Sequence, residues 1–121
     1  MYSKVVLDRF MSPNHCGLIK NADVVATFTS EATGDMVKLY LSLDKDKIVD
    51  AKFKAFGSPI TICAADIMCE MLFGKTLEEA TALSNKEVED IMDMPKTEKL
   101  HASVMLEELV VEATKIYKKK K

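Results

Sequence analysis

The residues with the clearest chemical potential stand where a strand pattern changes into a helix pattern. Residues 51–55 alternate apolar and charged side chains, Gly57 breaks the pattern, and Ser58 and Pro59 make a typical helix start, with serine as N-cap. A helix start directs unpaired backbone N–H groups and a positive dipole end outward. This junction therefore favours an anion, or a metal-bound anionic ligand, at Ser58.

A thiol and two carboxylates follow on the same helix. Cys63 comes five residues after Ser58, and Asp66 and Glu70 share a helix face with it. This arrangement could supply sulfur and oxygen ligands to a metal ion. The alternative is that Cys63 is a small buried hydrophobic residue, as free cysteines commonly are.

The chain has two further cysteines, Cys16 and Cys69. Cys69 lies six residues after Cys63, about 600° further round the helix, and so points elsewhere. Cys16 stands in a turn beside His15. Because three is an odd number, and because nothing at the start of the chain resembles a signal peptide, we expect a cytoplasmic protein without a disulfide framework.

Composition excludes several classes of function. The net charge is −2, and four positive charges fall in residues 118–121, so the remaining chain carries −6. An acidic body without a basic patch argues against nucleic acid, and no apolar run has the length of a membrane span. There is no Ser/His/Asp arrangement and no Gly-x-Gly loop. We therefore expect neither an enzyme nor a nucleic-acid or membrane protein.

The elements that must position these residues are predicted to form one domain over residues 1–121. The patterns predict an N-terminal amphipathic helix, then three strands joined by hairpin-length links, then helices with capping boxes at Thr76–Glu79 and Ser84–Glu87. The predicted ranges are 3–11 for the first helix, 24–30, 35–43 and 48–56 for the strands, and 102–117 for the last helix, followed by a frayed lysine-rich tail at 118–121. The fold class is α+β, with a three-stranded antiparallel sheet packed against helices and a helical C-terminal half.

Three junctions carry a family resemblance: Ala32-Thr-Gly-Asp35, Phe56-Gly-Ser58 and Lys99-Leu-His-Ala-Ser103. Together with the element order and the segment Gly74-Lys-Thr-Leu-Glu-Glu-Ala80, they resemble the NifU/IscU family of iron–sulfur cluster assembly scaffolds. The resemblance runs over nearly the whole chain. It implies the IscU-like fold, a [2Fe–2S] cluster as cofactor, and a cysteine desulfurase as partner.

The family cluster site corresponds to Thr33, Asp35, Ser58, His101 and Ala102 of this chain. The family has cysteines where this chain has Thr33, Ser58 and Ala102. Iron–sulfur clusters are held mainly by thiolates, whereas hydroxyls ionise far less readily and alanine has no donor atom. We therefore predict a degenerate member that lacks the three ligand cysteines, and we expect family-type [2Fe–2S] binding to be impaired.

Asp35 and His101 match the family and suggest a relocated site for iron or zinc. Cys63 would complete it, with Cys16 as a further candidate. The alternative is structural, because Asp35 after Gly34 is a natural turn residue.

Two hypotheses on partners remain open. One is an iron–sulfur assembly protein that docks on a cysteine desulfurase; the other is a metal-free interaction or regulatory module on a desulfurase or another partner. The family's Leu-Pro-Pro-Val-Lys chaperone motif is altered at residues 94–99, so chaperone binding is not expected.

Overall fold

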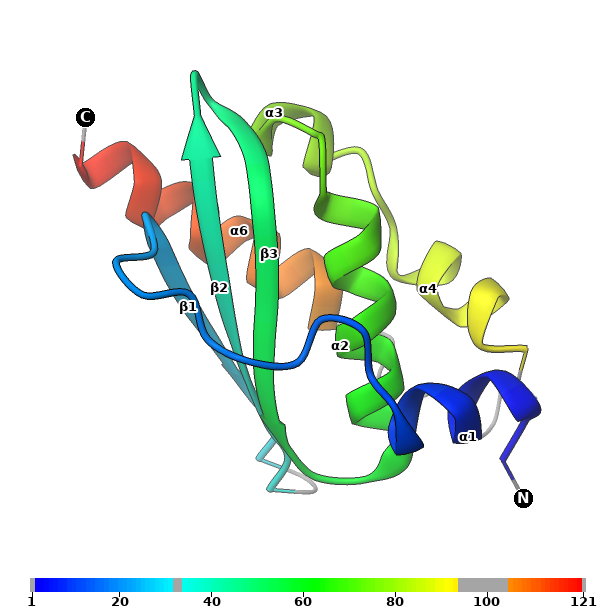
Figure 1. Cartoon of the computed structure of the whole chain (residues 1–121). Helices are drawn as coiled ribbons and strands as arrows, with labels where there is room; N and C mark the ends of the chain where they lie inside the picture. Colours follow the sequence, from blue (N-terminus) through cyan, green and yellow to red (C-terminus); the bar gives the residue numbers. More distant parts are fainter. Residues whose placement is uncertain (1, 32–33, 94–104, 121) are drawn as a thin grey trace.

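The structure is a computed structural model of the chain that describes residues 2–31, 34–93 and 105–120. The described residues form a three-stranded antiparallel sheet in the order β1-β2-β3, with helices packed on one face (Figure 1). The elements are α1 (Lys4–Met11), β1 (Val24–Thr29), β2 (Met36–Asp44), β3 (Lys47–Phe56), α2 (Pro59–Leu72), α3 (Leu77–Ala80), α4 (Asn85–Met92) and α6 (Met105–Lys120). This confirms the predicted α+β fold.

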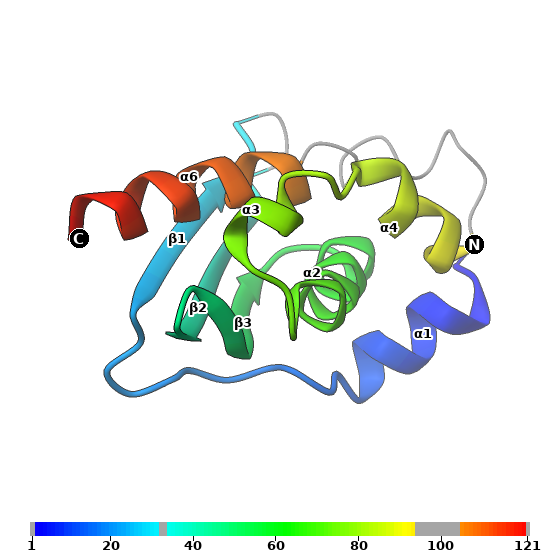
Figure 2. The same cartoon turned by 90° about the horizontal axis from the view of Figure 1, so that it is seen from above.

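The sheet has one buried and one outward face, as the alternating patterns predict. Leu39 of β2 pairs with Ala26 and Phe53, and all three side chains are buried. A register shift between Ser42 and Leu43 interrupts the β2–β3 ladder before the hairpin. The buried face makes the core together with α2 and α6 (Figure 2).

Local capping explains where the helices begin. The Ser58 side chain accepts a hydrogen bond from the backbone N–H of Thr61, with Pro59 in the first helical position. Thr76 and Glu79 form the expected capping box of α3, with distances of 3.0 and 2.9 Å. These starts agree with the sequence prediction because capping depends on neighbouring residues alone.

The last helix differs from its prediction at its C-terminal end. α6 continues to Lys120, so the lysines at 118–120 belong to the helix rather than to a frayed tail. Positive charge in the last turn suits the negative end of the helix dipole. The predicted start of this helix at 102 lies outside the described residues. None of the described helices has the length and apolar character needed to span a membrane.

A connecting segment, residues 12–23, crosses the outward face of the sheet between α1 and β1, and we call it the strap (Figures 1 and 2). It bonds to the free edge of β3, where the Gly17 N–H donates to the Phe53 carbonyl at 2.8 Å and the Phe53 N–H donates to the His15 carbonyl at 3.0 Å. At its far end the Asp23 side chain accepts a hydrogen bond from the backbone N–H of Leu43 at 2.7 Å. The strap therefore fixes α1 relative to the sheet.

Candidate functional site

The start of β2 and the end of β3 bring Asp35 beside Gly57. Met36 and Phe56 are paired across the ladder, so the residues next to them meet at the same end of the sheet. A Cβ atom added to Gly57 would lie 2.5 Å from Asp35 Oδ1. Glycine at position 57 therefore leaves the space that the Asp35 carboxylate occupies.

Thr61 links this carboxylate to the start of α2. Its hydroxyl donates to Asp35 Oδ2 at 2.6 Å and lies 3.3 Å from Ser58 Oγ. Thr61 is 4% exposed, so the Asp35 carboxylate and the helix start are joined by a mostly buried hydroxyl. Sequence reasoning missed Thr61, although its place three residues after a helix N-cap could have indicated it.

Of the five predicted cluster-site residues, the structure places two, Asp35 and Ser58, and brings both to Thr61. Thr33, His101 and Ala102 lie outside the described residues, as does the altered chaperone motif at 94–99. The donor atoms that the described part of the junction offers are carboxylate and hydroxyl oxygens, which are poor ligands for iron–sulfur clusters.

Cys63 lies on a different side of α2 from this junction. Two residues along a helix turn the side chain by about 200°, so that Thr61 faces Asp35 while the Cys63 thiol approaches the Val5 carbonyl of α1 at 4.0 Å. Burial raises the pKa of Cys63 to about 11; Arg9 opposes this rise and Asp66 adds to it. The thiol is therefore neutral at physiological pH.

The other two thiols also lie apart from the junction. Cys69 is buried, and burial, with a smaller contribution from Asp66, raises its pKa. Cys16 is exposed on the strap. Within residues 2–31, 34–93 and 105–120, no group of three or more His, Cys, Asp or Glu side chains could hold a metal ion. The metal site on Asp35, His101 and Cys63 stays a prediction, because His101 is not among these residues.

The sequence matches the model of the NifU-like N-terminal domain over residues 1–121. The chain belongs to this NifU-like family. Its relatives include the iron-sulfur cluster assembly scaffold protein IscU of Rickettsia prowazekii, which is 35% identical over 124 residues, covering 99% of this chain and 94% of the relative. The scaffold protein IscU 1 of Archaeoglobus fulgidus is 34% identical over 103 residues, covering 85% of this chain and 67% of the relative.

Solved structures of similar proteins support the fold. A scaffold protein for the SUF system from Fervidobacterium islandicum superposes with a TM-score of 0.78 at 24% identity, covering 93% of this chain and 95% of the other. A NifU-like N-terminal protein from Brucella abortus gives a TM-score of 0.74 at 16% identity, covering 98% and 95%. Proteins of the NifU-like family are scaffolds and not catalysts, which agrees with the expectation that this chain is not an enzyme.

Membership of the NifU-like family does not by itself show whether this chain has the cluster-ligand cysteines. This chain contains three cysteines, Cys16, Cys63 and Cys69, so loss of cluster thiolates is not shown by the match. The replacement of ligand cysteines by Thr33, Ser58 and Ala102 stays a prediction.

The carboxylates near Cys63 have a different role from the predicted one. Asp66 is completely buried and accepts hydrogen bonds from the Arg9 guanidinium at 2.7 Å and from the His15 backbone N–H at 2.8 Å. Arg9 also pairs with Glu70, and this hydrogen bond lowers the pKa of the Glu70 carboxyl. In this NifU-like chain the two carboxylates therefore hold the N-terminal segment against α2.

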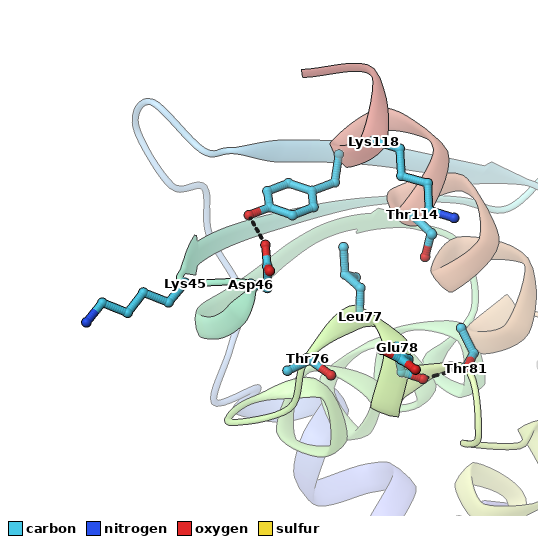
Figure 3. Close-up of a pocket in the computed structure, with 9 residues that line it drawn as sticks. Lys45, Asp46, Thr76, Leu77, Glu78, Thr81, Thr114 and Lys118 are labelled. Carbon is cyan, nitrogen blue, oxygen red and sulfur yellow. Dashed lines mark hydrogen bonds between the residues drawn. The ribbon is translucent and has the colours of Figure 1, made fainter. Parts of the chain in front are cut away.

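A hollow of about 690 Å³ lies at the opposite end of the sheet, between the β2–β3 hairpin, α3 and α6 (Figure 3). Tyr117 lines it and donates a hydrogen bond to Asp46 Oδ1 at 2.8 Å. Its charged lining residues, Lys45, Asp46, Glu78 and Lys118, balance in sign. The hollow thus favours neither an anion nor a cation.

Proposed function

We propose that this chain works in iron–sulfur cluster assembly as a scaffold-family domain with altered ligand positions. On this proposal Thr33, Ser58 and Ala102 stand where the family has its three cysteines. The observation that carries it is the hydrogen bond from Thr61 to Asp35 beside Ser58. At the family's strand-to-helix junction, this chain would then have hydroxyl and carboxylate groups that are hydrogen-bonded to one another in place of a thiolate.

The donor set of the described junction does not fit a [2Fe–2S] cluster. Ser58 Oγ already accepts from the Thr61 N–H, and one oxygen of Asp35 accepts from the Thr61 hydroxyl. A cluster ligand would have to break these bonds and offer hydroxyl oxygen to iron, which prefers thiolate sulfur in such clusters. We therefore propose that the cluster is not held at this junction in the family's manner.

A residual site for iron or zinc on Asp35, His101 and Cys63 is the narrower version of the proposal. It requires the Cys63 thiol to lose its proton although its pKa is raised to about 11, and to turn away from the Val5 carbonyl. Both requirements weaken this version. The metal content of protein purified without chelator would test it directly, with Asp35→Ala and His101→Ala as variants.

We propose a cysteine desulfurase as partner and the cytoplasm as compartment. The partner comes from the family resemblance. A reducing compartment suits three unpaired cysteines, one of which is exposed. The second candidate function is a metal-free interaction or regulatory module that docks on the desulfurase or another partner. The internally bonded Ser58–Thr61–Asp35 junction favours this candidate, because it needs no ligand to satisfy those atoms.

Anaerobic reconstitution with iron, sulfide and a cysteine desulfurase tests the proposal. We expect the chain to stay colourless in the visible region. We expect the triple variant Thr33→Cys, Ser58→Cys, Ala102→Cys to gain the absorption of an iron–sulfur cluster. A stable chromophore in the unaltered chain that is lost in Cys63→Ala would contradict the proposal.

Co-elution with the desulfurase on size exclusion separates the two candidates from an unrelated function. A colourless chain that binds the desulfurase and changes its rate of sulfide release would favour the regulatory module. A chain that neither binds the desulfurase nor gains a cluster as the triple variant would refute both.

A further inference from the structure

The hollow at the hairpin end of the sheet has the size of a site for a small molecule. Its volume of about 690 Å³ falls within the range of about 300–1,000 Å³ that is usual for ligand sites. Three parts of the chain that are distant in sequence form it, namely the β2–β3 hairpin, α3 and the C-terminal part of α6 (Figure 3). The Asp35–Gly57 junction lies at the other end of the sheet, so the hollow is separate from it.

Two of the four charged side chains that line the hollow leave its interior free. Asp46 accepts the hydrogen bond from Tyr117, and the Lys45 side chain extends away from the hollow in Figure 3. The remaining two are Lys118 of α6 and Glu78 of α3, which lie on facing walls. Within the described part of the chain, neither of these two side chains is engaged in an ion pair or a hydrogen bond. One positive and one negative group thus line the same hollow without contacting each other.

The rest of the lining joins an apolar surface to hydrogen-bond acceptors. Leu77 and the ring of Tyr117 supply the apolar part (Figure 3). The hydroxyls of Thr81 and Thr114 donate to backbone carbonyls about one helical turn earlier in the chain, at 2.6 and 2.8 Å. Their oxygen atoms are therefore left to accept from a ligand. Such a lining suits a molecule that has an apolar part and a donor group such as an ammonium.

We propose that this hollow binds a free amino acid with an apolar side chain. The ligand carboxylate pairs with the Lys118 ammonium, and the ligand ammonium pairs with the Glu78 carboxylate. The ligand side chain rests on Leu77 and Tyr117. A simple anion would be repelled by Glu78 and a simple cation by Lys118, so a molecule that carries both charges fits better than either. The inference depends on the hollow alone and does not rest on cluster assembly.

Binding at this site is expected to be weak. Lys118 and Glu78 are both exposed, so water screens the two charged contacts. We expect a Kd on the order of 1 mM for the free amino acid.

A titration of the full chain labelled with ¹⁵N tests the proposal with three ligands that share one apolar group. L-Leucine has both charges, 4-methylpentanoate lacks the ammonium, and 3-methylbutylamine lacks the carboxylate. We expect L-leucine to shift the amide signals of the hairpin, α3 and the C-terminal part of α6. Each analogue should bind at least about tenfold more weakly, because it loses one attraction and keeps one repulsion.

Two matched pairs of variants locate the charged contacts. Lys118→Met and Glu78→Gln each remove one charge from the hollow and should weaken L-leucine binding by about fivefold or more. Lys119→Met and Glu112→Gln make the same changes at exposed positions of α6 outside the hollow and should leave binding unchanged. Urea unfolding of the four variants shows that each compared protein is folded.

Three outcomes would overturn the proposal. The first is an analogue that binds as tightly as L-leucine, which would make the hollow a site for a simple anion or a simple cation. The second is L-leucine binding that stays unchanged in folded Lys118→Met and Glu78→Gln. The third is the absence of saturable shifts up to about 20 mM L-leucine, well above the expected Kd.

Discussion

Replacing Arg9 by methionine should destabilise the protein far more than the loss of an ordinary surface ion pair. The side chain of Asp66 is completely buried and that of Arg9 is 20% exposed. Arg9→Met keeps much of the side-chain volume but removes the guanidinium donor from the Asp66 carboxylate, which keeps its hydrogen bond from the His15 N–H. Removing one partner of a buried pair costs about 3–5 kcal/mol. Because Arg9 is partly exposed, we expect Arg9→Met to lower the free energy of unfolding by about 2–4 kcal/mol.

Two companion variants allow the loss in free energy of unfolding from Arg9→Met to be compared with that from milder changes. Asp66→Asn keeps an oxygen that can accept from the His15 N–H, and it leaves Arg9 paired with Glu70, so we expect a smaller loss of about 1–2 kcal/mol. Lys86→Met removes an exposed ion pair with Asp90 one helical turn away, worth about 0.3–0.5 kcal/mol. The double variant Arg9→Met, Asp66→Asn should cost less than the sum of its single changes, because no charge then remains buried and unpaired.

Urea unfolding followed by circular dichroism measures these free energies. Its pH dependence gives a second readout. Arg9 lowers the pKa of Glu70, so the stabilisation is present above the pKa of Glu70 in the unfolded chain and is lost as pH falls through the lower folded value. Arg9→Met should remove that part of the fall in the free energy of unfolding at acid pH. If Arg9→Met costs no more than Lys86→Met, or if the effects of the double change are additive, the Arg9–Asp66 pair does not hold the N-terminal segment against α2.

Three further predictions follow from the thiols, the junction and the caps. With the pKa of Cys63 raised to about 11, roughly one molecule in a thousand carries the Cys63 thiolate at pH 8. Alkylation followed by mass spectrometry should therefore modify the exposed Cys16 first, and the alkylation rate of Cys63 should rise about tenfold for each pH unit. Rapid modification of Cys63 at pH 7 would refute its burial. Gly57→Ala should lower the thermal midpoint because the new Cβ would meet the Asp35 carboxylate. Adding Asp35→Ala to this variant should restore part of the lost midpoint. Additive losses from the two changes would contradict the close contact. Thr76→Ala should cost about 1 kcal/mol by urea unfolding, since it removes half of a capping box, and no loss would show that α3 does not depend on it.

The sequence predicted those features whose causes are local. Alternation around Leu39 and Phe53 gave the strands and their buried face, and the residues at Ser58 and Thr76 gave helix starts that the structure confirms. Such patterns depend on neighbouring positions, so they can be read without knowing the fold. Of the five predicted cluster-site residues, the structure describes two, Asp35 and Ser58; the other three lie outside the described residues.

The role of Asp66 could not be predicted in this way. An acidic residue in a largely apolar helix has the same local pattern whether it binds a metal or an arginine. Its partner Arg9 is 57 residues away in the chain, and its second donor, His15, is 51 residues away. Contacts of this kind depend on how the fold packs α1 and the strap against α2. They follow from the topology and leave no local signal in the sequence.

The docking of α1 also has a consequence for the order of events during synthesis. The Ser3 hydroxyl donates to the Met92 carbonyl at 2.6 Å, across 89 residues of chain. At ribosomal rates of about 5–20 residues per second, the N-terminal segment waits several seconds before the residues that hold it have been made. The N-terminal segment of this chain therefore reaches its final position only after α4 has been synthesised. Until then Val6, which becomes completely buried, is available to other proteins in the cell.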